Sequence, residues 1–398
     1  MQKSIGDVNL LMTTNSSHAV LFTLAICTFF LALSMTFSSN AFARKTNQAI
    51  YEEPFDLASG GSTLTRATQE GILFANPAQL PYGGKFFRWF GLKTSLMTNK
   101  ESISFAKDMA NSAGSSGSST SEGESSGSDG GQTQEFVDKV FETPIHFGAS
   151  NALSWISNNG GISAFYRFEP DVAAKKFSET GLPAINFQAE AYGGIVGSVA
   201  ARTPWSWLSL GLTGKYLYVA EPSLSVALND EEKIKELQQS KLAQNMMSLN
   251  KGTGFDTGVL MFFQGYWCDY RLALKVDDVG TTKLSGDNEP KSFKQTIHAG
   301  TSLTFHNDID AIHLSADVRD ITRQYDEALF KRLYLGMKIL FRGYVGLGGG
   351  LYQGYPSYGA YLDLIFMRLS ATYYTRELGD HPGVEPRNLY VMSFSLGF

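Results

Sequence analysis

An alternation of large apolar and small or polar side chains recurs along the second half of this chain, and it limits the possible folds more than any other feature. The last nine residues, YVMSFSLGF, show it clearly: Tyr390, Phe394 and Phe398 alternate with small residues from Ser393 onward. Successive side chains of a β-strand point to opposite faces. The pattern therefore indicates a strand with one face in an apolar medium. A disordered C-terminal tail would not be expected to show this alternation.

The same alternation appears in WLSLGLTGKYLY, CDYRLALKVD, QTIHAGTSLTF, AIHLSADVR, RLYLGMKILF and MRLSATYYTR. A soluble sandwich also alternates. These segments, however, run for about ten residues, longer than the usual strand, and they match a tilted membrane crossing. We predict about fourteen strands from this period. They lie near residues 85–97, 147–156, 162–172, 184–198, 207–219, 254–265, 268–278, 294–305, 311–319, 331–341, 342–352, 358–364, 367–376 and 388–398.

The connections between these strands alternate in length. Every second one is short, as in NNGG, ARTPWS, GYW and HNDID, and the others are mostly longer. A barrel with an even strand number and both termini in the periplasm has short periplasmic turns and long outer loops. In lipid, an open sheet edge would leave backbone groups unpaired. The sequence therefore predicts an all-β fold: a closed antiparallel transmembrane β-barrel of about fourteen strands, its last strand paired with its first.

Composition and charge agree with a barrel and exclude other classes. After the first 43 residues, no run of about eighteen apolar residues occurs, so a helical membrane protein is excluded. Charged residues are 18% of the chain and aromatic residues 13%, an unusual balance for a soluble domain. The formal charge of −5 argues against a nucleic-acid partner.

The first 43 residues read as a secretory signal peptide. The apolar run AVLFTLAICTFFLAL is followed by SSNAFA, and Ala41 and Ala43 predict cleavage before Arg44. A membrane anchor is the alternative, but the run is short for a span. Cleavage leaves Cys268 as the one thiol, so no internal disulfide is expected. These features predict an outer-membrane protein with both termini in the periplasm.

The remaining chain divides into a short N-terminal part and the barrel. Residues 44–83 are mildly acidic and not strand-like, and residues 84–398 hold the strands. Two long outer loops interrupt them, at 99–146 and 220–253. The first contains a Ser/Gly-rich tract at 111–132 that is expected to be disordered. The second contains NDEEKIKELQQSKLAQNMMS, which predicts a helix over the barrel mouth or a helix for partner docking.

Two stretches resemble a known family. ANPAQL, with Asn76, Pro77 and Ala78, resembles the motif near the mature N-terminus of the FadL superfamily of outer-membrane hydrophobic-compound channels. The last third, with HLSADVRDI, GGGLYQGYPSYGAYLDL and ATYYTRELGDHPG, resembles PorV-like members of the same superfamily. The resemblance implies a fourteen-stranded barrel, an N-terminal hatch inside it at 44–83, and binding of apolar ligands. The sparser TLTRATQEGILFANPA departs from the usual Gly-rich, acidic hatch and leaves the ligand open.

Alternation also assigns charged side chains to the lumen. We expect this set to face inward: Lys215, Asp269, Arg271, Lys275, His298, His313, Asp317, Arg319, Arg332, Lys338, Arg368 and Arg376. Buried charges need partners, so three roles stay open. They form a salt-bridge lattice, or they hold the acidic hatch, or they bind the carboxylate of an amphipathic ligand. Candidates for ligand binding are Arg319, Arg332, Arg368, Lys338 and His298.

Gly193 and Gly194 interrupt a long predicted strand and suggest a bulge or kink. In FadL-like channels a kinked strand makes a side exit in the wall; a tight bend without an opening is the alternative. At the chain end, Tyr390, Phe394 and Phe398 are candidates for the signal read by the barrel-assembly machinery.

Signals for enzymatic chemistry are poor. HNDIDAIH gathers His306, Asp308, Asp310 and His313, but Asn-Asp is turn chemistry, so no metal is expected. GLGGG lacks the helix needed to cradle a phosphate, and no cofactor is predicted. The sequence thus predicts a non-enzymatic outer-membrane channel for small hydrophobic or amphipathic compounds. The alternative is a PorV-like assembly or secretion component that docks protein partners through its outer loops.

Overall fold

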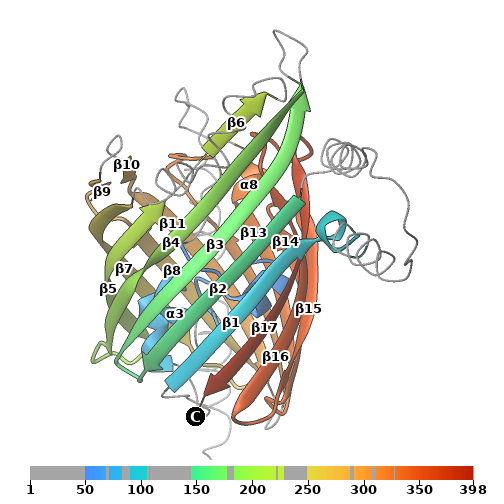
Figure 1. The fold of residues 1–398 in the computed structure, drawn as a ribbon. Coiled ribbons are helices and arrows are strands. Elements are labelled where there is room, and N and C mark those ends of the chain that lie inside the picture. Colours follow the sequence, from blue (N-terminus) through green and yellow to red (C-terminus); the bar gives the residue numbers. More distant parts are fainter. Residues whose placement is uncertain are drawn as a thin grey trace, which may run out of the picture. The chain divides into compact units, whose positions relative to one another are not determined.

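The wall of the molecule is built from long strands (Figure 1). The computed structural model describes residues 50–68, 71–82, 90–104, 107, 145–176, 183–220, 223–227, 249–286, 291–306, 310–326 and 328–397. Its wall strands are β1 (Phe90–Asn99), β2 (Ile145–Ile156), β3 (Gly160–Lys176), β4 (Pro183–Arg202), β5 (Leu208–Ala220), β7 (Asn250–Phe263), β8 (Cys268–Asp277), β11 (Thr296–His306), β12 (Asp310–Val318), β13 (Leu333–Phe341), β14 (Val345–Tyr352), β15 (Tyr355–Asp363), β16 (Met367–Glu377) and β17 (Pro386–Gly397).

These strands close into a ring. The described sheet has 15 strands, and one of them, β6 (Ser223–Ala227), pairs only with β4 at its margin. The other fourteen pair antiparallel with both neighbours, and β1 pairs with β17 from Gly91↔Gly397 to Asn99↔Leu389. The predicted closure between the last and first strands is therefore confirmed. No strand edge of the ring is left open within the described residues, as a lipid-facing sheet requires.

The two faces of the ring differ as the alternation predicts. Outward side chains are large, apolar and exposed, among them Leu96 at 63% and Met392 at 69%, and Tyr390 and Phe394 also point outward. Of the charged residues expected inside, Arg319 and Arg368 are half-buried and the others are buried. Phe398 lies outside the described residues. An apolar exterior around a polar, filled interior is the pattern of a membrane barrel.

A charge on the outer face is expected to weaken folding in a membrane. Met392 lies at the middle of β17, opposite Leu96 and Ala371. Met392→Arg should cost about 2–4 kcal/mol of folding free energy in a bilayer, the cost of a cation at the midplane. Urea unfolding in lipid vesicles measures it, with Met392→Leu as the control. Equal stabilities would show that this position does not face hydrocarbon.

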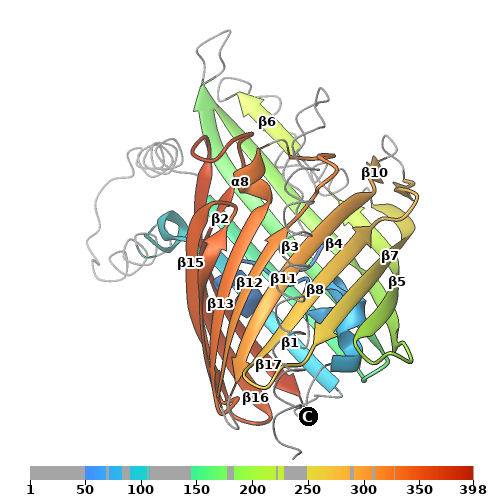
Figure 2. The same cartoon turned by 180° about the vertical axis from the view of Figure 1, so that it is seen from behind.

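The two ends of the barrel carry different connections (Figure 2). One end, here the short-turn end, has the turns 157–159, 203–207, 264–267, 342–344 and 364–366. The opposite end, here the long-loop end, has connections such as 319–332 and 378–385. It also carries three small elements that the sequence pattern did not reveal: β9 (Thr282–Leu284), β10 (Lys291–Phe293) and α8 (Leu329–Arg332). Arg332 ends α8, so its expected place within a strand from 331 was wrong.

Several predicted features fall outside the described residues. They are the signal peptide at 1–43, the tract at 111–132 and the helix at 229–248. None of the described helices is long and apolar enough to cross a membrane.

Candidate functional site

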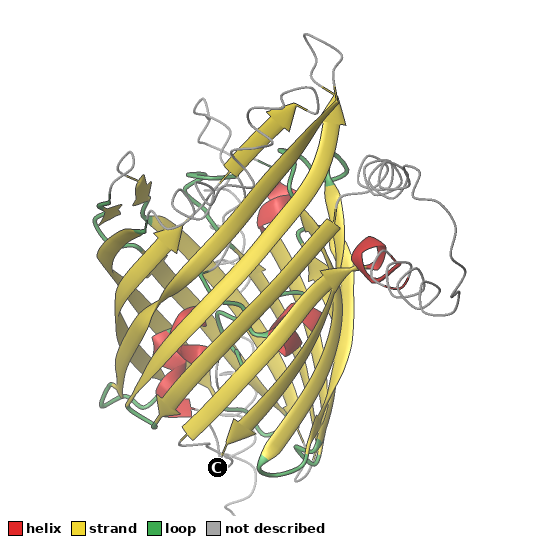
Figure 3. Ribbon diagram, viewed as in Figure 1, coloured by secondary structure: helices red, strands yellow, loops and turns green. Residues whose placement is uncertain are grey.

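The described part of the chain from residue 50 to 82, residues 50–68 and 71–82, lies inside the ring (Figure 3). It contains α2 (Pro54–Ala58), α3 (Ile72–Ala75) and the 3-10 helix η1 (Pro77–Tyr82). Its side chains are deeply buried, with Phe55 at 1% exposure and Ala78 and Leu80 at 0%. We call residues 50–82 the N-terminal segment. Its contacts with the inner wall define the candidate site.

Cations of the wall hold the acidic start of this segment. Lys93 of β1 pairs with Glu53, and Lys338 of β13 pairs with Asp56 at 2.5 Å between Nζ and Oδ1. Glu52 accepts a hydrogen bond from Tyr352 Oη at 3.1 Å and lies 3.4 Å from Arg319 Nη1 and 3.8 Å from Arg376 Nη2. Lys338, Arg319 and Arg376 thus pair with the acidic start of the segment, as one of the three roles left open by the sequence requires. Buried charges of this kind depend on their partners, because either one alone would be uncompensated.

Asp317 of β12 fixes the next part of the segment. Its Oδ2 accepts backbone hydrogen bonds from Thr63 at 2.6 Å and Leu64 at 2.9 Å. Arg319, two residues along the same face, donates to the carbonyl oxygen of Gly61 at 2.5 Å. The backbone of the segment is therefore bound to the wall between Gly61 and Leu64.

Lumen-facing glycines make room for the segment. We call Gly211, Gly258, Gly336 and Gly350 the glycine seats. A Cβ on Gly336 would overlap the carbonyl oxygen of Ser59, and a Cβ on Gly350 would lie 2.8 Å from Gly60 Cα. A Cβ on Gly211 would overlap the amide nitrogen of Ala78, and one on Gly258 would overlap Asn76 Oδ1. The segment thus touches the wall at positions where any other residue would displace it.

The predicted motif Asn76-Pro77-Ala78 forms the turn that enters two of these seats. Asn76 is fully buried; its Nδ2 donates to the carbonyl oxygen of Leu64 at 2.9 Å, and its Oδ1 accepts from Ala78 N at 3.0 Å. The amide also reaches the wall, at 3.4 Å from the carbonyl oxygen of Val259 on β7. Asn76 therefore ties two parts of the segment to each other and to the barrel.

Tyr82 closes the segment. The Arg202 guanidinium lies 4.2 Å from its ring centroid and that of Arg271 lies 5.8 Å away, while Phe262 packs edge-on at 4.9 Å. Arg202 also donates to the carbonyl oxygen of Pro81. Cation–π contacts of this type add to the packing of the ring.

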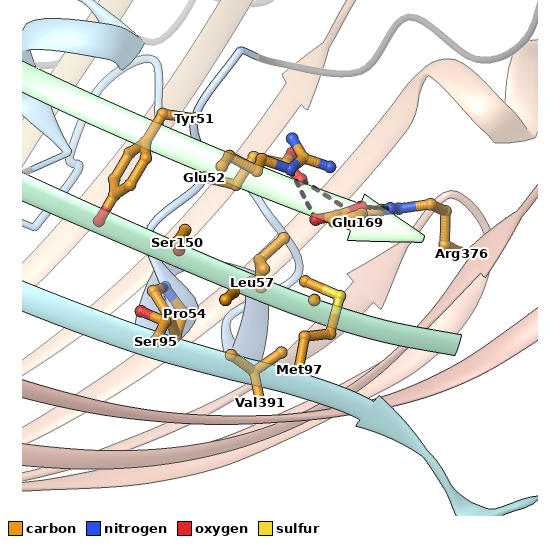
Figure 4. A pocket seen from close by; sticks show the side chains of 13 residues that line it. Tyr51, Glu52, Pro54, Leu57, Ser95, Met97, Ser150, Glu169, Arg376 and Val391 are labelled. Carbon is orange, nitrogen blue, oxygen red and sulfur yellow. Dashed lines mark hydrogen bonds and ion pairs between the residues drawn. The ribbon is translucent and has the colours of Figure 1, made fainter. Parts of the chain in front are cut away.

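A small cavity remains between the start of the segment and the wall (Figure 4). Arg167 and Arg376 both bind Glu169 there, at 2.6 and 2.8 Å. The volume open to the centre of a water molecule is about 20 Å³, enough for about one or two waters. This cavity is too small for an organic ligand. The lining residues are Tyr51, Glu52, Pro54, Leu57, Ser95, Met97, Gly148, Ala149, Ser150, Arg167, Glu169, Arg376 and Val391.

An apolar column crosses the interior beside this cavity. At its centre, the rings of Tyr51 and Phe74 from the segment pack on Phe165 of β3, with centroids 6.2 and 5.2 Å away. We call the whole group the apolar column. Its buried members are Tyr51, Ile72, Leu73, Leu80, Ala152, Ile156, Phe165, Val196, Ala200, Leu217, Val219 and Leu284, with Phe74, Tyr192 and Phe293 packed against them.

The other predicted ligand-binding candidates have partners in the wall and its loops. Arg368 binds Asp363 at 2.7 Å. His298 lies 3.0 Å from Asp277 Oδ2, and Arg332 donates to the carbonyl oxygen of Asp320 at 3.2 Å. These three therefore contribute to contacts within the wall and its loops.

Gly193 and Gly194 lie on β4, next to the apolar column. The pairing of β4 with β3 and with β5 runs through both glycines without a break in register. A Cβ on Gly194 would overlap the carbonyl oxygen of Tyr216. A side opening at this point stays a prediction of the resemblance.

Sequence reasoning missed Lys93, Arg167 and Glu169 as site residues. Alternation along FYRFEPD puts Arg167 and Glu169 on one face of the predicted strand, and this is the signal that could have found them. Lys93 could have been found in the same way, since Lys93 and Ser95 share the inner face of β1.

Among the described residues, no group of three His, Cys, Asp or Glu side chains is placed to hold a metal ion. Residues 307–309, part of HNDIDAIH, lie outside the described residues.

Comparison with known proteins gives matches among solved structures only. No protein-family model matches the sequence, and no curated protein matches it. The chain is similar to a deletion mutant of the monoaromatic hydrocarbon channel TodX, with a TM-score of 0.48 and 10% identity over 90% of this chain and 100% of that one. It is similar to the toluene transporter TbuX of Ralstonia pickettii, with a TM-score of 0.47 and 11% identity over 89% and 100%. For the toluene transporter TodX of Pseudomonas putida the TM-score is 0.45, with 10% identity over 90% and 100%.

Proposed function

We propose that this protein is an outer-membrane channel for small apolar compounds, held closed by its N-terminal segment. The closed ring and its exposed apolar exterior support a place in a membrane, where unpaired strand edges are not tolerated. The short-turn end faces the periplasm in this proposal, because outer-membrane barrels carry their short turns there. The segment is the hatch that the sequence resemblance implies.

The apolar column is the observation that carries the proposed substrate class. A water-filled pore has a polar lining, whereas the inner faces of β3, β4 and β5 carry, beside the paired charges of Arg167, Glu169 and Lys215, an apolar patch formed by Phe165, Val196, Leu217 and Val219. Such a surface is unfavourable in contact with water and favourable in contact with an apolar solute. A hydrocarbon-like compound is therefore the solute that this lining suits.

Passage requires the segment to move. The cavity beside it is too small for an organic molecule, and Ile72, Leu73 and Leu80 of the segment complete the column. In our proposal the compound leaves water at the long-loop end, follows the column and passes when the segment shifts. Arg319 and Lys338 then act in closing the channel, and no covalent chemistry takes part.

Transport into proteoliposomes tests the proposal. Purified protein should speed the entry of the apolar dye N-phenyl-1-naphthylamine over protein-free vesicles, and should leave the entry of a sugar of similar size unchanged. Asn76→Ala removes three hydrogen bonds of the segment and should raise the dye rate further. Sugar entry as fast as dye entry would contradict an apolar pathway, and no dye entry with either protein would contradict a channel.

The rival role, docking of protein partners through outer loops, stays a prediction. The loops that would carry it, 99–146 and 220–253, lie mostly outside the described residues.

A further inference from the structure

A hairpin at the long-loop end packs against the inside of the wall. Strands β9 and β10 pair with each other, from Thr282↔Phe293 to Leu284↔Lys291, and form a sheet separate from the barrel (Figure 1). A Cβ on Gly254 of β7 would overlap Thr282 Oγ1, and one on Gly252 would lie 2.8 Å from Leu284 Cδ2. Like the glycine seats, these two glycines let a second piece of chain lie close to β7.

The hairpin covers the apolar column at that end. Leu284 is 2% exposed and belongs to the column, and Phe293 packs against it. Leu217 and Val219, near the long-loop end of β5, belong to the same apolar column. The column therefore includes residues of two elements that are not wall strands: the hairpin near the long-loop end and the N-terminal segment further in.

A buried ion cluster ties the hairpin to the wall. Lys215 of β5 lies 2.7 Å from Asp256 of β7 and 2.8 Å from Asp278, the residue that begins the connection to β9. Asp278 in turn accepts a hydrogen bond from Thr282 Oγ1 at 2.6 Å. Burial raises the pKa of Asp278; Lys215 opposes this and the Asp256 carboxylate adds to it. Lys215 is thus the cation that keeps two close carboxylates and the base of the hairpin together.

The base of the hairpin is also conformationally strained. Asp278 has φ of 54° and Thr281 has φ of 69°, and Gly280 between them has φ of 77°. A left-handed backbone is unfavourable for a β-branched residue such as threonine. The ion cluster and the apolar contacts of the hairpin hold this conformation in place.

We propose that the β9–β10 hairpin is an outer gate, which must leave the apolar column before a solute can enter it. This inference rests on the proposed function and adds a second barrier to it. A solute enters by replacing the contacts of Leu284 and Phe293 with its own, so uncharged apolar compounds are the class that this gate admits. The channel then has two barriers in series. The hairpin forms one of them and the N-terminal segment forms the other.

A reversible crosslink tests the gate. Lys251 of β7 and Ser285 after β9 form a bridge with both backbone hydrogen bonds, at 2.9 Å each. Cα atoms in such a pair are about 5.5 Å apart, within disulfide range. We would introduce Lys251→Cys and Ser285→Cys together with Cys268→Ser. As the matched control, Lys283→Cys and Ser292→Cys join β9 to β10, which pair at these residues, without tying the hairpin to the wall.

Oxidation of the first pair should reduce N-phenyl-1-naphthylamine entry to the protein-free level, and reduction should restore it. Oxidation of the control pair should leave entry unchanged. Lys215→Met, which removes the cation of the cluster, should raise entry severalfold. Dye entry that is the same in the oxidised and reduced forms of the first pair would overturn the gate while leaving the channel proposal intact. Failure of the parent protein to admit dye would instead reject the channel itself.

Discussion

Gly258→Ala is expected to open the channel. A Cβ on Gly258 would overlap Asn76 Oδ1 and lie 3.3 Å from Pro77 Cδ, so the Asn76-Pro77-Ala78 turn must leave its seat. Forced overpacking of this kind costs the seated state about 1–3 kcal/mol. Because each 1.4 kcal/mol changes an equilibrium about tenfold, the displaced state should become roughly five to a hundred times more populated.

Single-channel conductance in planar bilayers measures this effect, together with the entry of an apolar dye into vesicles. Gly197→Ala on β4 is the matched control, since a Cβ there meets nothing within 4 Å. Both variants should keep the mobility shift of a folded barrel on gels. Conductance of Gly258→Ala equal to that of Gly197→Ala would mean that the turn at Asn76 does not block the lumen.

Lys338→Met is expected to release the start of the N-terminal segment. Lys338 is 5% exposed, and its Nζ donates to Asp56 Oδ1 at 2.5 Å and to the carbonyl oxygen of Arg66 at 3.0 Å. Removing one member of a buried ion pair costs about 3–5 kcal/mol, because the other is left uncompensated. Asp56 keeps its hydrogen bonds from Thr68, so the loss should fall in the lower part of this range.

Protease cleavage within residues 50–82 reports this release, since a docked segment resists cleavage. Lys338→Met and Asp56→Asn should each speed cleavage, and the double variant should be faster by less than the product of the two effects. Arg368→Met is the control, because Arg368 binds Asp363 of the wall. Effects of the two single variants that multiply fully would show that Lys338 and Asp56 act independently.

Strand positions and faces could be predicted because a strand has a strict period of two. The prediction of a strand at 367–376 agrees with Met367–Glu377, and Arg368, Thr372 and Arg376 lie on the inner side as expected. The alternation of side chains cannot be recognised in an element that is too short to show it more than once. The four residues of α8 show no pattern, which is why Arg332 was assigned to a strand.

The partners of the inward charges could not be predicted from the sequence. Alternation places Lys338 inside the barrel, but its partner Asp56 is 282 positions away on a segment without strands. Glycines gave a similar ambiguity. GLGGG at 346–350 continues β14 without interruption, and its glycines make room for Ala58 and Gly60. The role of such a glycine can be recognised only when the backbone that packs against it is known.

The pairing of the first wall strand with the last has a consequence for biogenesis. The ring joins Gly91 to Gly397, so no intermediate that lacks the final strand can seal it. Contacts so distant along the chain form slowly, and until they form, two unsatisfied edges are available to other chains. Helix α2 of the N-terminal segment meets β14, β15, β16 and β17, which are synthesised last. A truncated chain therefore differs from the complete barrel in one defect, the missing pairing between β1 and β17, and quality control of the nascent chain could detect it.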